Sequence, residues 1–343
     1  MRCRAAYRNQ SRVREGGLTK LSKLERPGIA ALAAVASVAP PFTAYHLGFV
    51  FGPRINAGGR VGRCGRGVDL LTATGPEAEE FAAALDSHNR ERQAIEKLIL
   101  DEAVTQAALQ DSWPFLFLTG EGWHPGVVGI VAGRLKERFA KPAFVAGFEG
   151  GPNDKIIGRG SARSVVGVDI GAIVRAAREA GALDAGGGHA MAAGFSLRPE
   201  QIDPFRAFLT GEFAKRTDAS SLAATLTLDA VVSPAGATPS LAGDIGRAGP
   251  FGAGNAEPVL AVPDVRIIFA DVVGKDHVRL RLAGGDGARL DAIAFRTADT
   301  DLGRALLGAR GKQIHAAGRL RADEWNGRVR VQLHLEDAAP AGV

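Results

Sequence analysis

Three consecutive glycines followed by a histidine form the stretch of this sequence that is best suited to chemistry. Gly186, Gly187 and Gly188 directly precede His189. A chain accepts the entropy that glycines lose on folding mainly where the backbone takes positive φ angles or closely approaches another group. Bare backbone N–H groups can bind an anion, and an imidazole adds a donor or a proton. The stretch predicts contact with a phosphate group; a glycine-rich turn with an incidental histidine is the alternative.

Two further segments, residues 52–60 and 158–164, combine arginine with glycine and other small residues. A guanidinium matches phosphate oxygens bidentately, and glycine lets a polymer come close. Three such loops in one chain favour a ligand that carries many phosphates, and we expect all three to meet at a common pocket. The side chains that we expect to bind phosphate or single-stranded DNA in these two segments are Arg54, Asn56, Arg60, Ser161 and Arg163.

Five motifs in a fixed order resemble the RecJ family, the single-strand-specific exonucleases of the DHH phosphoesterase superfamily. The resemblance covers nearly the whole chain, and it is the order of the five motifs that makes it specific. The motifs are RINAGGR (54–60), GWHPGVVGIVA (122–132), GRGSARS (158–164), GGGHAMAAG (186–194) and GPFGAGNAEP (249–258).

The resemblance implies an α/β fold class, in which a DHH-associated α/β domain follows a long connecting helix and precedes an OB-like β-barrel. The alternation of short apolar strands and helices between residues 115 and 215 independently favours α/β. The segment from Pro76 to about Leu109 reads as one long helix whose polar middle faces solvent or DNA. The expected domains are 1–75, a remnant of the DHH domain; 76–111, the connecting helix; 112–218, the α/β domain with the GGGH motif; and 219–343, the barrel.

The C-terminal region changes to short strands separated by glycine turns, which suggests a small barrel. Asn326-Gly327 is a strong signal for a two-residue hairpin turn. OB folds bind single strands through a basic groove and stacking aromatic rings. An ordinary solvated strand face is the alternative for these positions. The residues that we expect to bind DNA in the barrel are Arg279, Arg281, Arg319 and Trp325.

Roles in the first domain follow from the resemblance. We expect His189 to contact the phosphate or nucleotide at the strand end, together with the three glycines before it. His189 is the one residue that we expect to be catalytic. Ser161 and Arg163 hold a neighbouring phosphate. Arg54, Asn56 and Arg60 line the passage towards the catalytic half. His124 is a rival candidate, for which a structural role in its own loop is the stronger interpretation.

The Asp-His-His metal motif of the family does not occur in this sequence. Hydrolysis with two metals needs several carboxylate and imidazole ligands around a pair of ions. We therefore expect Mn²⁺ or Mg²⁺ to be bound by a family half that lies upstream, and no metal or other cofactor in this chain. The start of the chain reads as a truncated or misread boundary, and an organellar transit peptide is the alternative.

Charge and cysteine content constrain the class of protein. The formal net charge is +5, but residues 1–26 hold eight basic and two acidic residues, so the remainder is nearly neutral. Phosphate binding must therefore be argued from local arginines. Cys3 and Cys64 form no CxxC pair, which fits a reducing cytoplasm, and no membrane span or secretory signal is expected.

The function that the resemblance implies is a single-stranded-DNA-specific 5′ to 3′ exonuclease acting in repair and recombination. In this chain we expect the substrate-binding part without the metal ligands, and hence no activity of the chain alone. The alternatives are an oligonucleotide or dinucleotide phosphodiesterase of the same superfamily and a non-catalytic single-strand binding fragment. Single-stranded DNA is the expected partner, with a repair helicase or a single-strand-binding protein as candidate protein partners and no membrane.

Overall fold

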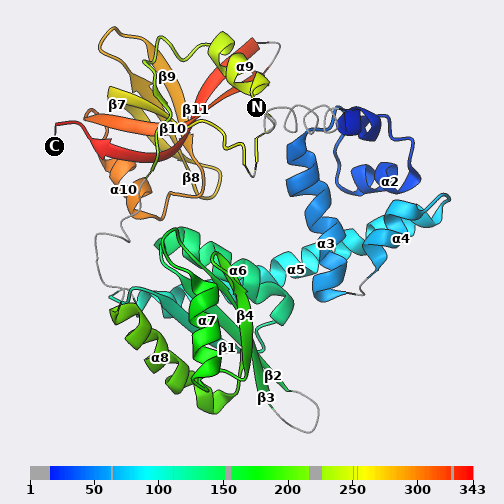
Figure 1. Ribbon diagram of the computed structural model, residues 1–343. Coiled ribbons are helices and arrows are strands. Elements are labelled where there is room, and N and C mark those ends of the chain that lie inside the picture. Colours follow the sequence, from blue (N-terminus) through cyan, green and yellow to red (C-terminus); the bar gives the residue numbers. More distant parts are fainter. Residues whose placement is uncertain are drawn as a thin grey trace, which may run out of the picture. The chain divides into compact units, whose positions relative to one another are not determined.

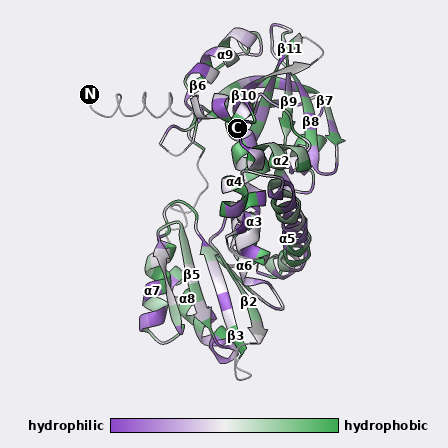
Figure 2. Cartoon of the chain, turned by 90° about the vertical axis from the view of Figure 1, so that its right-hand side faces the viewer, coloured by the Kyte–Doolittle hydropathy of each residue, from purple (hydrophilic) through white to green (hydrophobic). Residues whose placement is uncertain are grey.

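The computed structural model describes residues 16–62, 65–110, 112–150, 156–215, 226–249, 251–252, 254–325 and 328–342, and for residues 149, 323–325 and 328 the backbone alone. The chain divides into two compact units, Met1–Ala224 and Thr225–Val343. Each unit has its own hydrophobic core. Figure 1 gives the labels of the elements, and Figure 2 shows hydrophobic and hydrophilic residues interspersed along the strands of both units. Within the described ranges, no helix combines the length and the apolar character needed to span a bilayer.

Unit 1 begins with helices and continues into an α/β layer. Its elements are α2 (Pro27–Val35), η1 (His46–Phe51), α3 (Gly52–Val61), α4 (Arg66–Thr72), α5 (Glu77–Ala108), β1 (Leu116–Glu121), α6 (Pro125–Phe139), β2 (Ala143–Gly150), β3 (Ile156–Arg163), α7 (Ile170–Glu179), β4 (Ala185–His189), β5 (Ala192–Leu197), η3 (Pro199–Gln201) and α8 (Ile202–Ala214).

The strands of unit 1 form one sheet in the order β1-β2-β3-β5-β4, in which β1 and β2 are parallel and the other pairs are antiparallel. Helices α7 and α8 bury their apolar residues on one face of the sheet, together with a cluster of phenylalanines. Helices α5 and α6 cover β1 and β2 on the opposite face. The expected α/β architecture is confirmed.

The long helix α5 runs from Glu77 to Ala108, within one residue of the expected bounds at each end. Its acidic first turn suits the positive end of the helix dipole. The expectation that its polar middle faces solvent or DNA is wrong in part, because Asp86, Asn89 and Arg92 are buried. Helix α3 packs against α5 there, and the buried polar groups are paired with one another and with α3.

All three segments that the sequence suggested as loops are regular structure. RINAGGR lies in α3, Ser161 and Arg163 lie on β3, and the triple glycine forms β4. None of the glycines in β4 has a positive φ angle. Glycine is used in β4 for close packing instead: a Cβ on Gly188 would lie 2.4 Å from the carbonyl oxygen of Ala192. Of the two reasons for glycine that the sequence left open, close approach of the backbone applies in β4 and positive φ does not.

Unit 2 is a β-barrel with three additional short elements. Its elements are β6 (Ala230–Val231), α9 (Pro239–Arg247), β7 (Leu260–Val273), β8 (His277–Ala283), β9 (Arg289–Ala294), α10 (Asp301–Gly308), β10 (Gln313–Trp325) and β11 (Arg328–Pro340).

The barrel closes because β7, β8, β9, β11 and β10 pair in that order and β10 pairs back with β7. Helix α10 lies between the third and fourth strands of the barrel in chain order, so the OB-like expectation is confirmed. Side chains alternate along β8: Val278, Leu280 and Leu282 are fully buried, while Arg279 and Arg281 point outwards. The outer surface of β8 and its neighbours is therefore the candidate ligand face.

Candidate nucleic-acid interface

A pocket of about 600 Å³ in unit 1 collects four of the residues expected to bind phosphate there, namely Asn56, Arg60, Ser161 and Arg163. Helix α3, the first turns of α6 and strand β3 line it, and among its lining residues three are arginines and none is acidic. A pocket whose described lining holds arginines and no carboxylate suits a phosphate group. Its polar lining side chains are Asn56, Arg60, Arg159, Ser161 and Arg163.

Hydrogen bonds hold two of these arginines in place. The Nη1 atom of Arg163 donates to Ser161 Oγ at 2.7 Å and to the carbonyl oxygen of Ala162 at 2.9 Å. Arg60 Nη1 donates to the carbonyl oxygen of Gly126 at 2.9 Å. Burial lowers the pKa of the Arg163 guanidinium, and the nearby positive charge of Arg60 lowers it further. A bound anion would offset the repulsion between the two guanidiniums, so the pocket favours a negatively charged ligand.

Two glycines lie where α6 meets these arginines, one against backbone and one against their side chains. A Cβ on Gly126 would lie 2.4 Å from the carbonyl oxygen of Arg60, so only glycine lets α6 begin directly against the end of α3. A Cβ on Gly129 would lie 3.1 Å from both Arg163 Nη2 and Ser161 Oγ. These contacts explain why a small residue stands at each place in the GWHPGVVGIVA motif.

The pocket continues onto an open part of the sheet. In strands β3, β5 and β4, Ser161 is registered with Gly194 and then Gly187, and Arg163 is registered with Ala192 and then His189. Cross-strand partners point to the same face, so all six residues share the face on which α6 lies. A Cβ on Gly187 would meet nothing within 4 Å. The floor between Arg163 and His189 is therefore flat and made of small residues.

Strand β4 is the edge of this sheet, and its outer edge is partly occupied. Arg175 Nη1 donates to the carbonyl oxygen of Gly188 at 2.9 Å, and Arg178 Nη1 donates to that of Gly186 at 3.4 Å. Both arginines belong to α7. The carbonyl groups of Gly186 and Gly188 therefore point away from β5, towards the open edge of the sheet. His189 is exposed but does not line the pocket of Arg163. It lies two strands away on the same face.

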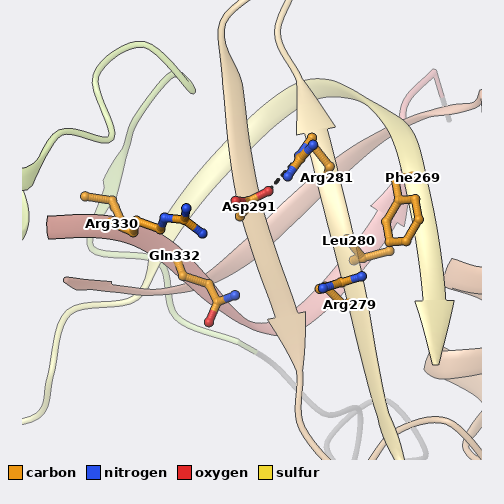
Figure 3. A pocket seen from close by; sticks show the side chains of 8 residues that line it. Phe269, Arg279, Leu280, Arg281, Asp291, Arg330 and Gln332 are labelled. Atoms are coloured by element: carbon orange, nitrogen blue, oxygen red, sulfur yellow. Dashed lines mark hydrogen bonds and ion pairs between the residues drawn. The ribbon is translucent and has the colours of Figure 1, made fainter. Parts of the chain in front are cut away.

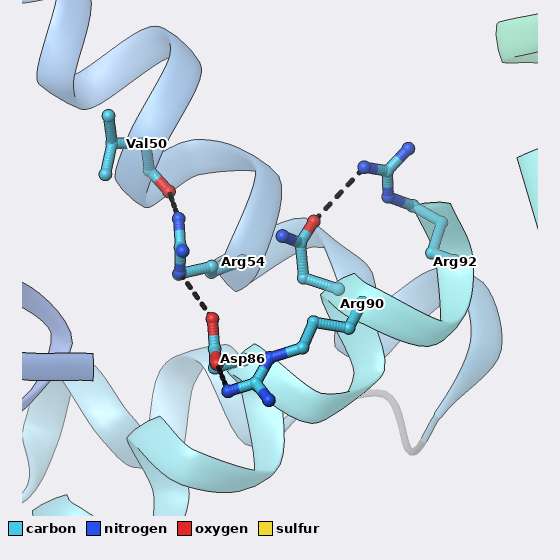
Figure 4. Close-up of polar contacts among 6 residues, drawn as sticks. Val50, Arg54, Asp86, Arg90 and Arg92 are labelled. Atoms are coloured by element: carbon cyan, nitrogen blue, oxygen red, sulfur yellow. Dashed lines mark hydrogen bonds and ion pairs between the residues drawn. The ribbon is translucent and has the colours of Figure 1, made fainter. Parts of the chain in front are cut away.

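Arg54 lies apart from this pocket. Its Nε donates to Asp86 Oδ1 at 2.8 Å and its Nη1 to the carbonyl oxygen of Val50 at 2.8 Å. Figure 4 shows Arg54 and Arg90 reaching Asp86 from two sides. Asn56 and Arg60 are four residues apart and share a helix face, whereas Arg54 is six residues from Arg60 and points elsewhere. The expectation that Arg54 lines the passage with Asn56 and Arg60 is not met: its role here is to pair with a buried carboxylate.

His124 caps helix α6. Its Nδ1 accepts the N–H of Gly126 at 3.0 Å, which fits the structural interpretation of this residue. Arg159 was missed by the sequence argument, although its signal was present: Arg159, Ser161 and Arg163 alternate as residues on one strand face do.

A second pocket of about 360 Å³ lies on the outer surface of the barrel. Figure 3 shows Arg279 beside the ring of Phe269 and Arg281 bonded to Asp291. The Arg279 guanidinium lies 5.2 Å from the centre of the Phe269 ring, and Arg281 Nε donates to Asp291 Oδ1 at 2.8 Å. The hydrogen bond that Arg281 donates to Asp291 raises the pKa of Arg281. Arg330, Val331 and Gln332 of β11 complete the lining together with Leu280.

Of the three expected barrel residues whose side chains are described, two lie together. Arg279 and Arg281 line the pocket, but Arg319 is paired with Glu336 at 3.0 Å and approaches Glu257 at 4.0 Å. Glu257, from the GPFGAGNAEP motif, also binds Arg321 at 2.6 Å. Glu257 and Glu336 together therefore neutralise Arg319 and Arg321. The side chain of Trp325 lies outside the described part of the structure.

Among the residues that the structure describes, no three His, Cys, Asp or Glu side chains gather closely enough to hold a metal ion. These residues therefore do not fit the divalent metal that the family resemblance implies.

Two domain models match the chain: the DHHA1 domain at residues 112–215 and the RecJ OB domain at residues 228–337. The chain is 35% identical to the single-stranded-DNA-specific exonuclease RecJ of Dickeya dadantii (strain 3937), over 92% of this chain and 55% of that protein. It is 33% identical to RecJ of Escherichia coli (strain K12), over 97% of this chain and 57% of that protein.

Among solved structures, the chain resembles RecJ from Thermus thermophilus in complex with Mg²⁺, with a TM-score of 0.76 and 25% identity. The match covers 95% of this chain and 48% of that chain. The chain thus spans about half the length of the relatives described here.

Proposed function

Because the chain belongs to the RecJ family, through its DHHA1 and RecJ OB domains, we propose that it is the strand-binding part of a single-stranded-DNA-specific exonuclease. One observation carries the proposal: a pocket with three arginines and no acidic residue opens beside a flat floor of small residues. A phosphate in the pocket leaves the adjoining nucleotide above that floor. In this arrangement Arg60, Arg159 and Arg163 bind the phosphate, Ser161 orients Arg163, and His189 lies beside the next part of the strand.

The reaction that we propose for the intact enzyme is 5′ to 3′ hydrolysis of phosphodiester bonds in repair and recombination, in the cytoplasm. The Mg²⁺ or Mn²⁺ of such an enzyme would activate the attacking water. Structures of relatives contain these ions. The relatives are also about twice as long as the part that this chain matches, so a metal-binding half would lie in their remaining residues. The residues described here would bind and orient the strand and place positive charge at its phosphates. A repair helicase or a single-strand-binding protein is the kind of protein partner that we propose.

The test is to measure binding of labelled single-stranded and double-stranded oligonucleotides to the full chain at several salt concentrations, and then cleavage with Mn²⁺ or Mg²⁺. We expect preference for the single strand and no cleavage by this chain alone. A phosphate neutralised in this pocket contributes about −0.7 to the slope of log affinity against log salt, and each further neutralised phosphate adds as much. Equal or tighter binding of the duplex would overturn the proposal. Tight binding of dinucleotides, with no gain from longer strands, would favour the phosphodiesterase alternative.

A further inference from the structure

An exposed aromatic cluster lies on the outer surface of the barrel, outside the pocket of Arg279 and Arg281. The ring of Phe295 has centroid distances of 5.1 Å to His277 and 5.0 Å to His334. The interplanar angles are 70° and 73°, so neither imidazole is stacked face to face on the phenylalanine. Phe295 is 48% exposed. A large part of the ring is therefore available to a ligand.

The cluster belongs to the same strand face as the basic pocket. His277 and Arg279 are two residues apart on β8, and Arg279 is registered with Ile293 of β9, which in turn is registered with His334 of β11. Cross-strand partners share a face, so the rings continue the outward row of Arg279. Positive charge and an exposed ring thus follow one another along the strands. Alternating contacts to phosphate and base are what a single strand requires.

The backbone beside the ring is held in an unusual conformation. Arg296 has a φ of 57°, a left-handed value that a long side chain rarely adopts. Its N–H donates to Nδ1 of His277 at 3.0 Å, which ties the turn after β9 to the start of β8. Strain of this kind persists where the surroundings fix it, and such positions gather at ligand sites. The contact fixes both the turn and the imidazole that touches Phe295.

We propose that Phe295 is a base-stacking residue that holds one unpaired base of the single strand, next to the phosphate contacts of Arg279. The inference rests on the proposed function and adds to it the place at which the barrel recognises a base. A single exposed phenylalanine is common on protein surfaces. Here its ring partners, its position on the same face as Arg279 and the fixed turn beside it point together to a planar ligand.

The experiment compares the full chain with its Phe295→Ala, Phe295→Leu and Phe295→Trp variants in fluorescence anisotropy. Two probes are used: oligothymidine, and a strand of the same length whose central nucleotides are abasic. We expect Phe295→Ala and Phe295→Leu to bind oligothymidine about tenfold more weakly and Phe295→Trp to bind like the parent. Binding of the abasic strand stays unchanged in all variants, because its phosphates remain. Val231→Ala, at a side chain 71% exposed on β6, is the matched control and binds both probes normally.

A second measurement locates the base directly. Irradiation of a complex with a strand that contains 5-iododeoxyuridine should attach the base to the peptide that carries Phe295, as read by mass spectrometry. Equal loss of affinity for both probes, or no cross-link at this peptide, would overturn the inference. If the parent chain binds single strands and the Phe295 variants bind them equally well, this inference alone is refuted. A parent chain that binds no single strand would refute the proposed function as well.

Discussion

Arg163 and His189 lie in one row of the unit 1 sheet, each registered opposite Ala192 from its own side. Adjacent strands are ~4.8 Å apart, so about 10 Å separates the two backbones. Both side chains leave the same face of the sheet. Two motifs that are separate in sequence therefore lie side by side in the sheet. Arg54, the third residue that we expected to converge with them, is instead paired with Asp86.

Replacing Arg163 tests the phosphate pocket. The Arg163→Ala variant should bind single-stranded DNA about tenfold more weakly, ~1.4 kcal/mol, because a charge-assisted contact is lost. The slope of log affinity against log salt should become shallower by about 0.7, as one phosphate contact disappears. Arg304→Ala removes an equal charge from α10, outside both pockets, and should change neither quantity by more than the error of the titration. An equal effect of both variants would show that only net charge matters.

Two neighbouring glycines of β4 should respond in opposite ways. A Cβ at Gly187 would meet nothing within 4 Å, so we expect Gly187→Val to leave stability equal or higher, because valine suits a strand. It should nevertheless weaken strand binding, because it adds bulk to the row of Ser161 and Gly194, next to the row of Arg163 and His189. Gly188→Val should lower the free energy of unfolding by about 1–3 kcal/mol through overpacking against β5. Thermal unfolding and DNA titration of both variants check this, and unimpaired binding by Gly187→Val would exclude the floor as a contact surface.

Asp291 restrains the barrel pocket electrostatically. The Asp291→Asn variant removes the acidic residue that lines the pocket and releases Arg281, so single-strand binding should tighten about two- to fivefold. Asp301→Asn on α10 changes the net charge equally at a distance from the pocket lining and serves as the control. Weaker binding by Asp291→Asn would indicate that the ion pair holds Arg281 in its binding position.

The buried carboxylate of Asp86 should contribute strongly to the stability of unit 1. Asp86 is 3% exposed and binds both Arg54 and Arg90. Asp86→Ala leaves Arg54, half-buried, without its carboxylate, and the free energy of unfolding should fall by about 3 kcal/mol. Glu91→Ala, on the exposed side of α5, should change it by less than ~0.5 kcal/mol. Urea unfolding followed by circular dichroism gives both values, and equal effects would mean that the Asp86 ion pairs add little.

Local sequence signals predicted where helices and strands lie. They did not predict the backbone conformation of the glycine-rich motifs. The segment that begins at Pro76 located α5, and the short strands separated by glycine turns indicated the barrel. The glycine motifs misled because glycine has two uses that sequence alone does not separate. It permits positive φ angles, and it permits close packing. In β4 the second use applies, since Gly188 lies against Ala192 and Ala193.

The sequence by itself determined the kinds of groups available: arginines beside glycines, a histidine after three glycines, and no Asp-His-His motif. It also determined the succession of an α/β layer and a barrel, because periodicity and turn residues are local properties. Only the tertiary structure decided which arginines are available to a ligand. Arg54 and Arg319 are paired with carboxylates of residues distant in sequence. Arg60 and Arg163, in contrast, line one pocket, where their positive charges repel each other. Such pairing depends on which elements the fold places together, and no local pattern encodes it.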